Sequence, residues 1–170
     1  KLLEIDFAKP FQRFDVLQTL EEKANIKLPE NFNEDEALPQ LREICESKGW
    51  KIKAPFTVAR YLDKMISEVI EPLCVQPSFI MNHPIALSPL AKRSSNDPRL
   101  TERFELFINQ KEYINAYSEL NIPSEQLDRF IGQNRIKIST NNDKNSKDFV
   151  DDEAHPVDMP FCNALQYGLP

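Results

Sequence analysis

RFELFINQKEYINAYSEL, residues 103–120, is the stretch that decides the fold. Aromatic residues and isoleucines lie on both sides of the polar pair Asn109–Gln110. Such residues favour β-strands, and a short polar pair between two strand-forming runs favours a tight turn. The stretch therefore predicts a β-hairpin that turns at Asn109 and Gln110, and we expect this hairpin to lie at the centre of the domain.

Three carboxylates, Glu105, Glu112 and Glu119, recur at intervals of seven within this largely apolar stretch. Burying a carboxylate without a partner is costly, so acids on central strands usually meet a metal ion, a cationic ligand or a basic side chain. The three glutamates could equally point into solvent from an exposed face of the sheet. The residues alone leave both interpretations open.

The register of the hairpin decides which acids meet. A two-residue turn pairs Phe107 with Glu112, which places Glu105 and Glu112 on the same face as diagonal neighbours. Two such carboxylates suit Mg²⁺, which completes its coordination with water and substrate phosphates. The pair is therefore a candidate site for a metal that bridges to a nucleotide.

A second set of polar residues lies further along the hairpin. Strict alternation puts Asn115, Tyr117 and Glu119 together on one face but Glu112 on the other. One extra residue in a strand reverses the facing of everything after it. We therefore predict a β-bulge between Glu112 and Asn115, so that both sets line one pocket.

Around the hairpin, apolar residues at helical spacing predict helices over residues 16–25, 38–48, 57–71, 125–131 and 159–167. Pro39 is expected in the first turn of its helix, and Ser124 is expected to cap another. An apolar run predicts a buried strand at residues 78–81. Residues 132–152, rich in Asn, Lys, Ser and Asp, are expected to form a mobile polar insertion in one domain that spans residues 1–170.

Composition narrows the classes of function. The chain has 27 acidic and 21 basic residues, a net charge of -6, which disfavours a broad surface that follows nucleic-acid phosphates. Any nucleic acid is expected to be held mainly by parts outside this segment. With only three glycines, no glycine-rich loop is present to cradle phosphates, so side chains or a metal would have to hold a nucleotide.

Other features point to an ordinary domain. Neither a membrane span nor a signal peptide is visible, so the expected location is the cytoplasm. The spacing of Cys45, Cys74 and Cys162 suits neither a disulfide framework nor a zinc site, and we expect three reduced, mostly buried thiols. His83 and His155 stand beside prolines, are expected to be structural, and are left out of the site.

Several short strings recur in a specific order and spacing: Asn82–Pro84, Ser88–Lys92, Leu100–Phe107, Asn115–Asn121 and Phe161–Pro170. Together they resemble the catalytic core of the class II lysyl-tRNA synthetases, and weaker similarity covers nearly the whole chain. The resemblance implies an α+β fold with an antiparallel sheet flanked by helices. It also implies a lysine–tRNA ligase that activates lysine with ATP and Mg²⁺, transfers it to tRNA during protein biosynthesis, and acts as a cytoplasmic homodimer.

The family's site residues carry over position by position. Glu105 and Glu112 match the glutamates that bind magnesium against the ATP phosphates, whereas Asn115, Tyr117 and Glu119 match the lysine pocket. Glu119 is expected to pair with the lysine ammonium and so to reject uncharged amino acids. The resemblance implies no nucleophile and no acid–base residue, because catalysis would be positioning and charge neutralisation.

The chain also departs from the family pattern. Ile122 replaces the usual aspartate, Gln166 replaces a glutamate, and residues 132–152 are longer than typical. The match begins after the family's motifs 1 and 2 and stops where motif 3 would begin. We therefore expect a fragment of a synthetase that does not form lysyl-adenylate alone.

Two alternatives share the resemblance. The parent could be a synthetase-like ligase that attaches lysine to a protein, with the same pocket. It could also be a non-catalytic binding module derived from a synthetase. The pair Glu105 and Glu112 speaks against the second alternative, because magnesium ligands have no evident use in a packing scaffold.

Overall fold

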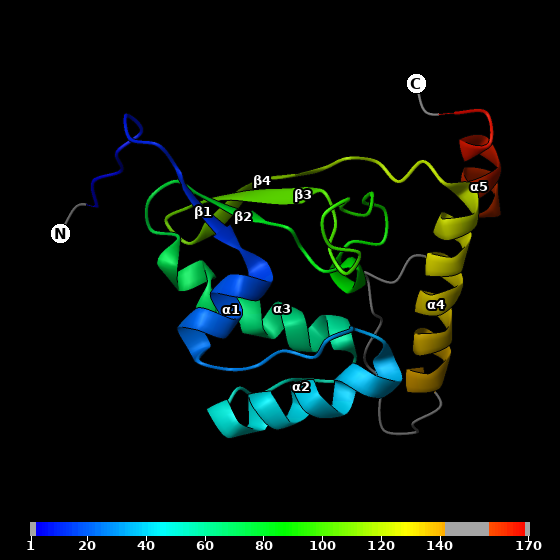
Figure 1. Cartoon of the computed structure of the whole chain (residues 1–170), viewed down its shortest axis with the longest axis horizontal. Helices are drawn as coiled ribbons and strands as arrows, with labels where there is room; N and C mark the ends of the chain where they lie inside the picture. The colour runs from blue at the N-terminus through cyan, green and yellow to red at the C-terminus, as the bar shows by residue number, and fades with distance from the viewer. Residues whose placement is uncertain (1–2, 142–156, 169–170) are drawn as a thin grey trace.

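The fold is an α+β arrangement in which one mixed sheet lies over three helices (Figure 1). The computed structural model describes residues 3–141 and 157–168. The elements follow in this order: β1 (Gln12–Asp15), α1 (Val16–Ala24), α2 (Glu34–Lys48), α3 (Val58–Val69), η1 (Glu71–Leu73), β2 (Ser78–Met81), η2 (Ile85–Leu87), β3 (Arg103–Ile108), β4 (Lys111–Tyr117), α4 (Pro123–Asn141) and α5 (Met159–Leu165).

The sheet has the strand order β1-β2-β3-β4. Strand β2 pairs antiparallel with β3, and β3 pairs antiparallel with β4. Strand β1 pairs with β2 in parallel. A mostly antiparallel sheet flanked by helices confirms the predicted fold class. The hairpin was expected at the centre, but β4 forms one edge of the described sheet, because β1 and β2 both add on the β3 side.

Helices α1 and α3 each begin after a capping residue, where the sequence predicts them to begin. The Asp15 carboxylate accepts a hydrogen bond from the Gln18 backbone N–H, and α1 ends at Asn25 in the left-handed conformation. The Thr57 hydroxyl accepts from the Arg60 backbone N–H at the start of α3. These side chains satisfy helix N–H groups that would otherwise lack a partner.

Helix α2 begins earlier than predicted, at Glu34, so Pro39 lies inside the helix and not in its first turn. Three consecutive acids occupy the first turn, where the helix dipole favours negative charge. Proline lacks an N–H, so one helical hydrogen bond is lost at Pro39. The helix ends at Lys48, as predicted, and Gly49 follows it in the left-handed conformation.

The hydrophobic core lies between the sheet and the helices α1, α2 and α3. Its central stripe runs along α3, and the predicted helical spacing is confirmed. The fully enclosed members include Leu20, Leu41, Leu62, Met65 and Ile80. Figure 1 shows α4 and α5 packed together at one end of this body.

Helix α4 corrects the predicted boundary of the polar insertion. It starts at Pro123, so Ser124 lies inside the helix and is not its cap. The helix continues to Asn141, so residues 132–141 are helical. After Pro123 the sequence of the helix contains no proline that would interrupt it. The rest of the predicted insertion, residues 142–152, lies outside the described residues, as does His155.

Two further expectations can be compared with the structure. Cys45, Cys74 and Cys162 are buried and unpaired, which confirms the prediction of reduced, buried thiols. Within residues 3–141 and 157–168, no helix has the length and apolar character needed to cross a bilayer. Strand β1 was not predicted; it has four residues, and its first two, Gln12 and Arg13, are exposed and polar.

Candidate active site on the hairpin face

A tight turn joins the two strands of the hairpin. Asn109 and Gln110 have φ angles of 52° and 61°, as a type I′ turn requires at both central residues. Ile108 pairs with Lys111 on either side of this turn. The backbone N–H groups of Asn109 and Gln110 donate to the carbonyls of Val75 and Cys74, so the turn is tied to the segment after η1.

The predicted bulge is present. Phe107 pairs with Glu112, but its neighbour Leu106 pairs with Ile114, so Tyr113 is the extra residue in β4. The bulge therefore falls between Glu112 and Asn115, as expected. It reverses the facing of the strand after Tyr113.

As a result, residues from both predicted sets share one face of the hairpin. Glu105 lies opposite Asn115, and Arg103 lies opposite Tyr117. Residues directly opposite each other in an antiparallel pair project to the same side. Glu112, opposite Phe107, projects to this side as well, because Phe107 and Glu105 alternate along β3.

Glu105 is the buried acid of this face, with 8% of its surface exposed. Arg103 donates from Nη2 to Glu105 Oε1, and His83 Nε2 lies 3.2 Å from Glu105 Oε2. Burial alone would raise the pKa of the carboxyl, but the neighbouring His83 and Arg103 outweigh it and the pKa is lowered. Glu105 is therefore held as a carboxylate.

Arg103 is the centre of a network of hydrogen bonds. Its Nε donates to Asn115 Oδ1 at 3.1 Å, while Nη2 donates to Glu105. Its Nη1 donates to the Leu87 carbonyl at 2.6 Å and to Ser88 Oγ at 3.0 Å. One guanidinium thus joins β3, β4 and the segment after η2.

The other predicted site residues are exposed. Glu112, Asn115, Tyr117 and Glu119 all lie on or just beyond the edge strand β4. The pKa of the Tyr117 phenol is raised by burial and by the nearby charge of Glu119, which places these two side chains in one electrostatic neighbourhood. The structure thus brings Glu105, Glu112, Asn115 and Tyr117 to one face, with Glu105 the buried one, and places Glu119 just beyond the end of β4.

Backbone pairing fixes the position of Glu119. The Lys92 N–H donates to the Ser118 carbonyl at 2.7 Å, and the Leu120 N–H donates to the Leu90 carbonyl at 2.9 Å. Ala91 and Glu119 form an antiparallel bridge. The segment after η2 therefore extends the ladder beyond β4 and holds the chain around Glu119.

Further acids lie close to Glu105. Burial raises the pKa of Asp63 on α3, and the charge of Glu105 raises it further. Burial also raises the pKa of Glu71, with added repulsion from Asp63, Glu105 and Glu112. Asp63, Glu71, Glu105 and Glu112 thus interact electrostatically as one acidic neighbourhood.

The donor set fits a magnesium ion that arrives with a substrate. In the described part of the chain, no group of three or more His, Cys, Asp or Glu side chains is placed to hold a metal. Mg²⁺ commonly takes one or two carboxylates and fills its other positions with water and phosphate oxygens. Glu105 and Glu112 match that pattern.

Two residues that lie against Glu105, Arg103 and His83, were not among the predicted site residues. Arg103 could have been found, because it precedes Glu105 by two positions and so shares its face. His83 gave no such signal. It lies in a separate segment, and only the fold brings its ring, 2% exposed, against Glu105.

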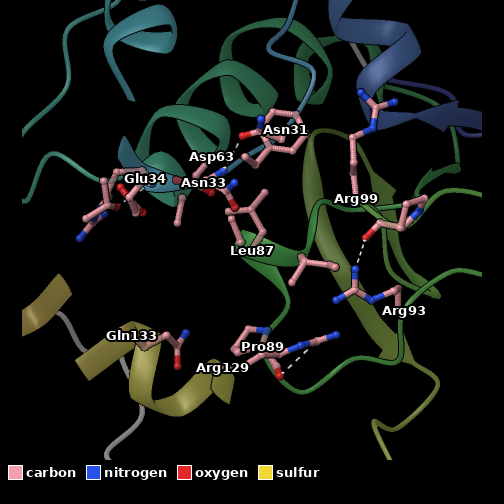
Figure 2. Close-up of a pocket in the computed structure, with 18 residues that line it drawn as sticks. Asn31, Asn33, Glu34, Asp63, Leu87, Pro89, Arg93, Arg99, Arg129 and Gln133 are labelled. Carbon is pink, nitrogen blue, oxygen red and sulfur yellow. Dashed lines mark hydrogen bonds between the residues drawn. The ribbon is translucent and has the colours of Figure 1, made fainter. Parts of the chain in front are cut away.

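A separate cavity of about 520 Å³ opens between the starts of α2 and α3, the segment after β2, and α4 (Figure 2). It includes none of the five predicted site residues. Three of its arginines already have partners within the chain: Arg99 pairs with Asp97, and Arg93 and Arg129 both pair with Glu125. These ion pairs link residues of the cavity wall to one another and to neighbouring acids.

A family model described as tRNA synthetases class II (D, K and N) matches residues 1–170. The probable cytoplasmic lysine–tRNA ligases of Encephalitozoon cuniculi and Vairimorpha ceranae are 45% and 46% identical to the chain, over 99% and 100% of its length. The lysine–tRNA ligase of Mycoplasmopsis fermentans is 38% identical over 99% of the chain. The chain covers 31% of each of these three relatives.

Proposed function

The chain belongs to the class II tRNA synthetases (D, K and N), and we propose that it is the part of a lysine–tRNA ligase that holds lysine and the metal-bound phosphates of ATP. The observation that carries the proposal is the bulged hairpin, which gathers Glu105, Glu112, Asn115 and Tyr117 on one face. Relatives over almost the whole chain are lysine–tRNA ligases by name, which supports lysine as the amino acid.

Lysine would bind along β4. Glu119 is an exposed carboxylate beside Tyr117, so its charge is available to the lysine ammonium. A hydrogen bond between charged groups contributes about 1.5–3 kcal/mol. A bound amino acid would cover Glu119 from water, so an uncharged one would leave the acid both unpaired and desolvated, and this penalty would provide selectivity. Asn115, oriented by Arg103, would contact the polar backbone groups of lysine.

ATP would bind beside Glu105 and Glu112. These two carboxylates would hold Mg²⁺, which when bound neutralises the phosphate charge. The chain's own part is to keep Glu105 ionised and fixed through Arg103 and His83. Formation of lysyl-adenylate then needs the lysine carboxylate placed in line with the α-phosphorus and opposite the pyrophosphate, which leaves as the carboxylate oxygen bonds to phosphorus; this is a positioning task.

The complete reaction belongs to a longer protein. The chain spans about a third of the length of its curated relatives, so transfer to tRNA, homodimer formation and a cytoplasmic location are proposals for the whole enzyme. The chain has 27 acidic and 21 basic residues, and this negative balance supports tRNA contacts that lie mainly in other parts of the longer protein. We expect the segment by itself not to form lysyl-adenylate, and ATP–pyrophosphate exchange measures this directly.

Lysine binding to the 170-residue chain tests the proposed pocket. Calorimetry should show that Glu119→Gln weakens lysine binding about 10- to 100-fold, the loss of one charged hydrogen bond. The control is Glu102→Gln, an exposed acid beside Arg103, which should leave the affinity unchanged. Equal binding of lysine and norleucine, which lacks the ammonium, would contradict a charge-based lysine pocket.

A further inference from the structure

We propose that Arg103 is a positioning residue that fixes Glu105 and Asn115 as one unit, so that metal–nucleotide binding and lysine binding depend on the same guanidinium. The inference rests on the proposed function, in which Glu105 serves the metal and Asn115 serves lysine. It adds a residue that touches neither ligand, yet orients a ligand-binding atom on each side.

Each of the three guanidinium nitrogens donates hydrogen bonds to different partners. Nη2 holds Glu105, Nε holds Asn115 Oδ1 at 3.1 Å, and Nη1 is fixed by the Leu87 carbonyl and Ser88 Oγ. The planar fork of arginine fixes the directions of these donors relative to one another. Displacement of either the carboxylate or the amide would therefore disturb the other.

The arginine is itself held in place. Its side chain is 15% exposed, so water competes little for its donors. The segment that anchors Nη1 is braced in turn by Arg129 of α4, whose Nη1 donates to the carbonyls of Ser88, Pro89 and Ala91 at 3.1, 3.2 and 2.7 Å. This second arginine keeps Ser88 at a fixed place for Arg103.

The contact leaves Glu105 able to bind a metal. A carboxylate has about four lone-pair positions. Arg103 occupies a position on Oε1, and His83 lies against Oε2, so further positions remain on the carboxylate. Arg103 can thus orient Glu105 without replacing the metal ion.

The test compares Arg103→Lys with the wild-type chain and with Arg13→Gln, an exposed arginine on β1 that serves as the control. Lysine keeps the charge but cannot hold the four partners of Arg103 in a fixed fork. Electron paramagnetic resonance would measure Mn²⁺ binding in the presence of a non-hydrolysable ATP analogue, and calorimetry would measure lysine binding. Loss of a residue that orients a metal ligand typically weakens metal binding about 10- to 100-fold.

We expect Arg103→Lys to weaken both Mn²⁺–nucleotide and lysine binding, and Arg13→Gln to change neither. If the wild type binds both ligands and Arg103→Lys binds them equally well, the role of Arg103 is overturned while the proposed function stands. If the wild type binds neither ligand, the proposed function fails, and the inference fails with it.

A measurement on the wild type covers the case in which Arg103→Lys does not fold. NMR should show the Arg103 Nε–H protected from exchange and shifted by both Mn²⁺–nucleotide and lysine. An Arg103 signal that exchanges as fast as that of Arg13, or that responds to one ligand alone, would overturn the inference.

Discussion

Glu105 on β3 lies directly opposite Asn115 on β4. The pairing sets a buried carboxylate beside an exposed amide, and Arg103 bonds to both. It depends on the bulge at Tyr113, because regular alternation from Glu112 would turn Asn115 to the other side of the sheet. Because Tyr113 bulges out of the ladder, the two halves of the candidate site share one face.

Deletion of Tyr113 should remove the bulge and keep the two halves together. Without Tyr113, Glu112, Ile114 and Asn115 become consecutive, so plain alternation already places Asn115 on the side of Glu112 and Glu105. We expect lysine binding and the Arg103–Asn115 hydrogen bond to be retained, which calorimetry and NMR would measure. Tyr113→Ala keeps the residue count and should retain both as well. Loss of lysine binding in the deletion variant alone would show that the bulge does more than set the facing of the strand.

Local patterns in the sequence predicted much of this hairpin. The polar pair at 109–110 marked the turn, and the conflict between Glu112 and Asn115 marked the bulge. Both features concern neighbours in sequence, where alternation and turn preferences act directly. The face that carries the candidate site could therefore be predicted before the fold was known.

Contacts between distant segments could not be predicted in this way. His83 meets Glu105 only because β2 pairs with β3, and β1 exists because it adds to β2 across more than sixty residues of sequence. No local pattern distinguishes Gln12–Asp15 from a loop. The length of α4 was also missed, because its polar second half resembles an exposed loop as much as an exposed helix.

Gln110→Gly should stabilise the turn. Gln110 has a φ of 61°, a conformation that costs a residue with a Cβ about 1–2 kcal/mol and glycine almost nothing. Greater freedom of glycine in the unfolded chain offsets part of the gain, so we expect the free energy of unfolding to rise by about 0.5–1 kcal/mol. Denaturant titration would measure it. Both variants lose the contact from Nε2 to the Pro72 carbonyl, but Gln110→Ala also keeps the Cβ, so it should not stabilise.

The cysteines should react slowly in the folded protein. Burial raises the pKa of the Cys45 and Cys74 thiols to about 11, and it also raises the pKa of Cys162. The thiolate is the reactive form, and at about pH 8 only about one thiol in a thousand with that pKa is ionised. A disulfide reagent should therefore label none of them rapidly until guanidinium chloride unfolds the chain.

Cys162 is expected to react first among the three. It lies on α5, a seven-residue helix that packs mainly against α4 and can open without unfolding the core. Mass spectrometry of partly labelled protein would identify the first site. Rapid labelling of Cys45 or Cys74 in the folded chain would contradict the burial of these thiols.

Glu34 should make the stability of the fold depend on pH. Both of its carboxylate oxygens accept from the Val58 N–H, at 3.1 and 3.0 Å, so it ties the start of α2 to the start of α3. Burial raises the pKa of this carboxyl above its ordinary 4.5, a Val58 hydrogen bond opposes the rise, and the charge of Asp35 adds to it. The folded state therefore holds its proton more tightly than the unfolded state.

The sign of the effect follows from linkage. A raised folded pKa means that ionisation of Glu34 costs stability: the penalty is absent below the unfolded pKa of about 4.5 and grows as pH rises through the folded value. Glu34→Gln keeps an acceptor for Val58 but cannot ionise. The melting temperature of Glu34→Gln minus that of the wild type should therefore increase as the pH is raised from about 4 to 7. Glu43→Gln, at an exposed position of the same helix, is the control. A difference between Glu34→Gln and the wild type that stays constant over this range would show that Glu34 ionises as readily in the folded state as in the unfolded chain.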